Sequence, residues 1–141
     1  MIIENSTLID KMLIDIAAMI SDGLTSNYIY ITASDDTTIL TKLKFSNVEY
    51  DATNQYLIFE KSSGTYKLIS SVLEDGVASR FYIFRHDDND FNTGVKVLSG
   101  TVGGVSDLDA DIKFSTVDWV RGNSVSLTSI KISLEDVCLH Q

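Results

Sequence analysis

The clearest pattern in the chain is a strict alternation of apolar and polar residues between positions 107 and 114. The apolar residues are Leu108, Ala110, Ile112 and Phe114, and those between them are Asp107, Asp109, Asp111 and Lys113. A period of two is typical of a strand with one buried and one solvated face. The pattern therefore predicts a strand over Asp107–Phe114, with a row of three aspartates on its solvated face.

The last apolar stretch, Ser124–Leu134, alternates as well but changes phase. Val125 and Leu127 fall on one side, whereas Ile130, Ile132 and Leu134 fall on the other. One extra residue near Thr128-Ser129 would restore a common face, so we expect a β-bulge there. The two alternations and the run Arg80–Arg85 predict a set of inward-facing core residues. These are Phe81, Ile83, Ile112, Leu127 and Ile132.

Other strand-like runs recur about every ten residues. They are Asn27–Thr32, Thr38–Phe45, Tyr56–Glu60, Tyr66–Ser70 and Val95–Ser99, while Val72–Ala78 fits a loop or a helical turn equally well. The loop at 61–65 has hairpin length and predicts a hairpin between its flanking strands. No segment between strands is long enough for a crossover helix, which argues against parallel pairing. We therefore expect an all-β fold, an antiparallel, jelly-roll-like β-sandwich.

One segment, Ser6–Asp22, has the period of an amphipathic helix. Ser6 or Thr7 can cap its start, and Gly23 can end it. Its apolar residues recur at three- and four-residue spacing. They are Leu8, Ile9, Met12, Leu13, Ile16, Met19 and Ile20. This face could pack on the protein's own sheet or on a neighbouring subunit. We expect one domain over 1–141, with the helix at 6–22, the sandwich at 27–134 and a C-terminal tail at 135–141.

Composition narrows the classes of partner. Twenty acidic residues against eleven basic ones give a net charge of −9, which argues against nucleic-acid binding. No apolar run approaches 18 residues and no leader pattern precedes the helix, so we expect neither membrane insertion nor export. The single cysteine, Cys138, excludes an internal disulfide.

A weak candidate for a metal site is the acidic stretch 87–94. Asp88, Asp90 and Asn92 have the 1,3,5 spacing of a calcium loop, but its sixth position holds Thr93, and Ser99 stands where a closing glutamate belongs. A solvated turn between strands is the alternative that we favour, and we expect no bound metal.

Catalytic motifs are weaker still. The row Asp107, Asp109 and Asp111 could serve a hydrolase only if an apolar site raised one pKa, and the alternation places it in water. His86 and His140 are far apart in the sequence. We therefore expect no catalytic residue, no cofactor and no enzymatic activity.

Several short stretches, in order, resemble a family of small tailed-bacteriophage proteins. They are Asn27–Thr32, Ser79–Arg85, Ser99–Gly103, Asp109–Phe114 and Gly122–Leu134. The chain departs from the family pattern in its acidic insert, 87–92, and in its tail, 135–141. The resemblance implies a virion structural protein encoded among head and tail genes, made in the host cytoplasm. It brings no catalytic residues.

The resemblance also implies how the protein would act. We expect contacts with capsid, portal, collar or tail proteins, and a homo-oligomer such as a ring or trimer. The interface candidates are Leu8, Met12, Ile16, Met19, Val137 and Leu139. The alternative is a host-surface or carbohydrate-binding module of a tail appendage, which an exposed aromatic platform of Trp119, Tyr56 and Tyr66 would favour.

Overall fold

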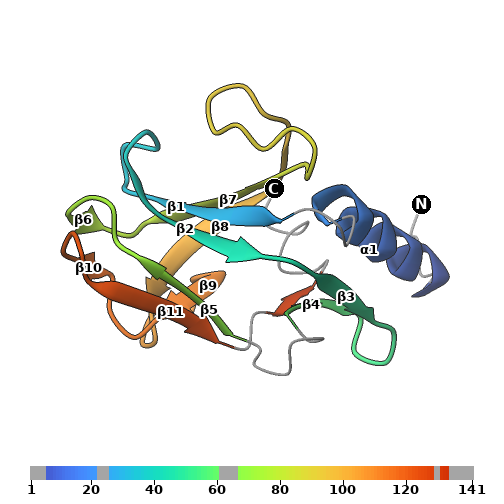
Figure 1. Ribbon diagram of the computed structural model, residues 1–141. Coiled ribbons are helices and arrows are strands. Elements are labelled where there is room, and N and C mark those ends of the chain that lie inside the picture. The colour runs from blue at the N-terminus through green and yellow to red at the C-terminus, as the bar shows by residue number, and fades with distance from the viewer. Residues whose placement is uncertain (1–5, 22–25, 61–66, 129–130, 134–141) are drawn as a thin grey trace.

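The computed structural model describes residues 6–21, 26–60, 67–128 and 131–133, which form a mostly β structure with one short helix (Figure 1). The helix and strands are α1 (Ser6–Ile20), β1 (Asn27–Thr32), β2 (Ile39–Phe45), β3 (Val48–Asp51), β4 (Tyr56–Phe59), β5 (Lys67–Ser71), β6 (Gly76–Val77), β7 (Arg80–Phe84), β8 (Lys96–Gly104), β9 (Ile112–Phe114), β10 (Asp118–Trp119), β11 (Ser124–Thr128) and β12 (Lys131–Ser133).

The largest sheet has five strands in the order β2-β1-β7-β8-β9. Its pairs are antiparallel except for β8 and β9, which run parallel with Val102 opposite Ile112. The prediction of purely antiparallel pairing is therefore wrong. No crossover helix is needed here, because β9 is only three residues long and turns at 104–110 bring the chain back beside β8.

Those turns also correct the predicted strand over Asp107–Phe114. The Asp107 carboxylate accepts the backbone N–H of Asp109 at 3.1 Å, and the Asp107 N–H donates to the carbonyl of Gly104. This local bonding competes with an extended chain. As a result Leu108, predicted to be inward, is 85% exposed, and no continuous aspartate row forms on one strand face. The strand itself is confined to β9, where Ile112 and Phe114 are buried as predicted.

The smaller sheets pair strands that are distant in sequence. β4 lies between β3 and β12, and β5 pairs with β11, so the predicted hairpin between Tyr56–Glu60 and Tyr66–Ser70 is wrong. The hairpin is instead β3–β4, because the Asp51 carboxylate accepts the N–H groups of Thr53 and Asn54 and closes that turn. β6 pairs with β10. It lies within Val72–Ala78, the stretch for which the sequence fits a loop or a helical turn.

The last apolar stretch is divided between two sheets rather than forming one strand. Its first half, β11, pairs with β5, and its second half, β12, pairs with β4. The change of phase in the sequence therefore accompanies a change of partner. The predicted bulge at Thr128-Ser129 lies at the edge of the described residues, since 129–130 fall outside them.

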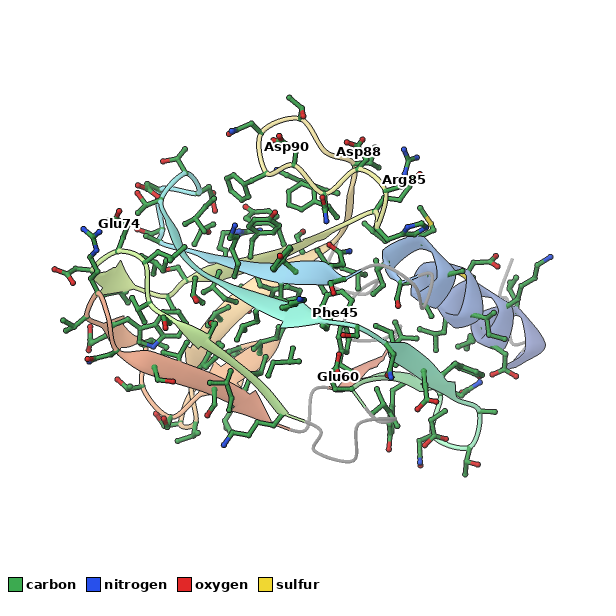
Figure 2. The ribbon with its side chains drawn as sticks, in the orientation of Figure 1. Phe45, Glu60, Glu74, Arg85, Asp88 and Asp90 are labelled. Atoms are coloured by element: carbon green, nitrogen blue, oxygen red, sulfur yellow. The ribbon has the colours of Figure 1, made fainter. Side chains whose placement is uncertain are left out.

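The main core lies between the inner face of the five-stranded sheet, the smaller sheets and α1. Four predicted core residues are confirmed, because the side chains of Phe81, Ile83, Ile112 and Leu127 are all at most 4% exposed. The side chain of Ile132 lies outside the described residues. Phe45, labelled in Figure 2, meets Phe59 edge-to-face with ring centroids 5.0 Å apart.

The helix α1 lies at the opposite end of the molecule from β6 and β10, against β3 and β4 (Figure 1). The helix prediction is confirmed over Ser6–Ile20, while Asp22 and Gly23 lie outside the described residues. Leu13 and Ile20 are buried in the main core. The predicted apolar face is thus packed on the protein's own sheets along only part of its width.

Candidate functional site

The outer face of the five-stranded sheet carries a cluster of aromatic residues that is separate from the main core. Alternation along β1 and β7 points Ile29 and Ile83 into the main core and turns Tyr30, Tyr82 and Phe84 to the other side. Phe91, from the loop between β7 and β8, covers them, with ring centroids 5.5 Å from Tyr30 and 5.9 Å from both Tyr82 and Phe84. The loop between β7 and β8 therefore lies over this face of the sheet, where the ring contacts of Phe91 hold it (Figure 1).

Four basic side chains border this cluster. Together with Tyr28 they form what we call the lysine–tyrosine face, which consists of Tyr28, Lys42, Lys44, Arg80 and Lys96. Lys42 Nζ lies 5.3 Å from the ring centroid of Tyr28, and Lys96 Nζ lies 4.6 Å from that of Tyr82. Lys44 is the cross-strand partner of Tyr28. Both distances are within the range of cation–π attraction. The face also includes Arg80, whose guanidinium lies 5.9 Å from the ring centroid of Tyr82.

The lysine–tyrosine face concentrates positive charge in an acidic protein. It holds four of the eleven basic residues, of which Arg80 is paired with Asp36. Among the described residues, Lys42, Lys44 and Lys96 have no carboxylate within ion-pair distance. All three are exposed. Their ammonium groups are thus available to an anionic partner.

The tyrosine hydroxyls of the cluster are tied to neighbouring turns. Tyr82 donates to Asp36 Oδ1 at 2.9 Å, and Arg80 Nε lies 3.3 Å from the same oxygen. Tyr30 donates to the carbonyl of Asn89 at 2.7 Å. Burial raises the pKa of both hydroxyls above the usual tyrosine value, and for Tyr82 the bond to Asp36 raises the pKa further.

These raised pKa values predict a loss of stability at alkaline pH. Tyrosine in the unfolded chain ionises near pH 10, whereas folded Tyr30 and Tyr82 keep their protons to higher pH. Their contribution is therefore complete below about pH 10 and is lost as the pH rises through the folded pKa values. Denaturant midpoints should decline above about pH 10, and Tyr82→Phe should decline less steeply. An identical decline in the variant would contradict the assignment to Tyr82.

Asn27 joins three parts of the structure and was missed by sequence reasoning. Its buried amide nitrogen donates to the carbonyls of Ile20, at 3.0 Å, and Phe84, at 2.7 Å. Its side-chain oxygen accepts the N–H of Tyr28 at 2.8 Å and lies 3.5 Å from the amide nitrogen of Asn89. The sequence offers one sign of this role, a polar residue directly before the alternating Tyr-Ile-Tyr-Ile run.

The candidate calcium residues lie on the β7–β8 loop, and the structure gives them separate partners. Asp88 Oδ2 is 3.9 Å from Arg85 Nη2, whereas Asp90 Oδ1 accepts the backbone N–H groups of Asn92 and Thr93 (Figure 2). Arg85 also bonds Asp87 at 2.6 Å and holds the pKa of that carboxyl below its usual value. The segment is a turn between strands, as favoured from the sequence. Within the described residues, no three His, Cys, Asp or Glu side chains form a metal-binding group.

The three aromatic residues whose exposure would favour carbohydrate binding are Trp119, Tyr56 and Tyr66. Trp119 is buried, donates from Nε1 to the carbonyl of Thr116 at 2.7 Å, and stacks edge-to-face on Phe114 at 4.9 Å. Tyr56 is half-buried on β4, and Tyr66 lies outside the described residues. The condition is therefore not met by Trp119.

Among the described residues, the remaining candidate side chains do not gather into a catalytic arrangement. Asp111 accepts the backbone N–H of Thr101 at 2.9 Å and so holds β9 beside β8. The backbone N–H of His86 donates to the carbonyl of Met19 at the end of α1, and His140 lies outside the described residues.

The interface candidates divide into three groups. Leu8, Met12 and Met19 are 36%, 40% and 41% exposed on α1. Ile16 is partly buried against the main core and lies between the exposed residues and the buried side of the helix. Val137 and Leu139 lie outside the described residues.

Comparisons with known proteins do not place the chain. No family model, curated protein or solved structure matches it. In the described part of the chain, no helix is long and apolar enough to cross a membrane.

Proposed function

We propose that this chain is a structural component of a tailed-phage virion, acting through protein–protein contacts without a cofactor or an enzymatic activity of its own. We further propose that its sheets form a jelly-roll-like β-sandwich whose copies assemble into a homo-oligomer. The resemblance of five ordered stretches to small phage proteins supports the first proposal. The mostly β architecture, with sheets on both sides of one apolar core, is compatible with the second.

The observation that carries this proposal is the divided apolar face of α1. Successive helical residues are rotated by roughly 100°, so the apolar residues cover an arc much wider than the stripe that meets the sheets. Leu13 and Ile20 fill the main core, while Leu8, Met12 and Met19 share one adjacent exposed stripe. We call these three residues the α1 stripe. An unused apolar flank on a packed helix is suited to contact with another protein chain.

A carbohydrate-binding module is the second candidate, and the structure favours it less. Sugar stacking needs an accessible ring face, but Trp119 is buried and Phe91 covers Tyr30 and Tyr82. Tyr28 is half-buried with Lys42 over its ring.

The α1 stripe can be tested by replacing Met12 and Met19 together with glutamate. We expect the variant to remain folded, because both side chains are about 40% exposed, and to lose oligomers in light scattering. Ile14→Glu is the matched control, since Ile14 is 50% exposed on another side of the same helix and should leave assembly unchanged. Mass spectrometry of purified phage particles should also detect the protein at high copy number. Absence from particles would overturn the virion proposal, and an unchanged oligomer in the double variant would overturn the role of the stripe.

A further inference from the structure

We propose that the lysine–tyrosine face binds the turn between β8 and β9, residues 105–111, of a second copy of this chain, in a head-to-tail contact. This inference rests on the proposed self-assembly, but it uses a surface separate from the α1 stripe. Two observations support it: a concentration of unpaired positive charge, and an exposed acidic and apolar turn elsewhere on the same molecule.

The receiving side is formed by edge strand β2 and its neighbour β1. Lys42 and Lys44 are exposed on the same side of β2, with Cα atoms about 7 Å apart, as expected for residues two apart in a strand. The half-buried ring of Tyr28 lies beside both, since Lys42 Nζ is over the ring and Lys44 is its cross-strand partner. The face therefore presents two exposed lysines beside the half-buried ring of Tyr28.

The proposed ligand has the complementary chemistry. Asp107 and Asp109 are exposed and flank Leu108, which at 85% is the most exposed large apolar side chain of the described residues. Val105, 69% exposed, adds a second apolar group on the same turn. An apolar side chain at the tip of an acidic turn matches an aromatic ring bordered by lysines. Complementary charge of this kind fixes the partner and the register of an interface.

Strand register places Lys44 and Lys96 at the opposite end of the five-stranded sheet from the turn, whereas Arg80, opposite Thr101, lies near the turn. Lys44 pairs with Tyr28 near the start of β1, and Lys96 pairs with Phe84 at the end of β7. β8 runs from Lys96 away from that end to Gly104, where the turn begins. A copy therefore presents the turn at one end of its sheet and receives a turn near the other. Repeated contacts of this heterologous type produce rings or filaments.

A charge exchange tests the contact directly. Lys44→Glu and Asp109→Lys should each lower the self-association constant by roughly fivefold, because each places like charges opposite one another. The double variant carrying both changes should recover most of the wild-type association, since the pair is reversed and not lost. Lys67→Glu is the control for net charge, as Lys67 is exposed on β5, which belongs to a different sheet from β1 and β2. Sedimentation equilibrium would measure all five proteins, with circular dichroism to establish that each is folded.

Each outcome decides the proposal. Recovery in the double variant supports the contact, and it would do so whether or not the α1 stripe also contributes. A wild-type protein that stays monomeric at millimolar concentration overturns it, as does a double variant as weak as either single one. Loss of binding to phage particles in Lys44→Glu, with self-association unchanged, would also overturn it by assigning the face to a different acidic protein. The measurements of self-association do not depend on the particle analysis that tests the proposed function.

Discussion

Replacement of Phe45 by alanine should lower the free energy of unfolding by about 3–5 kcal/mol. Phe45 is 1% exposed at the end of β2 and packs edge-to-face on Phe59 from β4. It therefore connects the five-stranded sheet to the smaller sheet beside α1, and its removal leaves a cavity that both sheets line. Chemical denaturation followed by tryptophan fluorescence would measure the change.

Two exposed positions are the controls for this prediction. Lys44→Ala, one residue away on the opposite face of β2, should change stability by less than about 0.5 kcal/mol. Leu108→Ala should be equally mild, because Leu108 is 85% exposed although the sequence pattern predicts it to be inward. A loss of 2 kcal/mol or more at Leu108, the size expected of a core leucine, would show that residues 107–114 form the continuous strand after all.

Replacement of Asn27 by leucine should cost roughly 3–9 kcal/mol, because three buried polar groups lose a partner. The substitution preserves volume but leaves the carbonyls of Ile20 and Phe84 and the N–H of Tyr28 without partners. Each buried polar group left unpaired costs about 1–3 kcal/mol. Thermal and denaturant unfolding would give the loss, which we expect to be accompanied by weaker protection of amide hydrogens at the end of α1.

Asn54→Ala is the comparison for the effect of removing an asparagine. Asn54 is exposed in the β3–β4 turn, where its amide bonds Asp51, and its removal should cost less than about 1 kcal/mol. If Asn27→Leu were as stable as the wild type, the three hydrogen bonds would contribute nothing beyond what water supplies to the unfolded chain.

The sequence predicts the elements of this fold better than their pairing. Alternation in Thr38–Phe45 correctly assigns Leu43 and Phe45 to the core and Lys42 and Lys44 to solvent, because side-chain period alone decides the face. The helix is found for the same reason. Pairing partners depend on turns instead, and here the decisive bonds come from aspartate side chains at Asp51 and Asp107, which alternation does not register.

The candidate site illustrates the same limit. The sequence directs attention to carboxylates at Asp88 and Asp90, whose spacing is conspicuous, and to the indole of Trp119. The lysine–tyrosine face goes unnoticed because its members come from β1, β2, β7 and β8 and become neighbours only through strand register. On α1 the sequence does name Leu8, Met12 and Met19 as interface candidates, but periodicity gives only the width of the apolar arc and not how much of it the sheets cover.

The pairing of β4 with β12 and of β5 with β11 has a consequence for synthesis on the ribosome. β4 and β5 must wait for partners that are made much later in the chain, so the core cannot close until residue 133 has left the exit tunnel. Until then the nascent chain exposes both α1 and two unpaired strand edges, which are surfaces that favour aggregation. We therefore expect truncations before β11 to depend on chaperones in the cell.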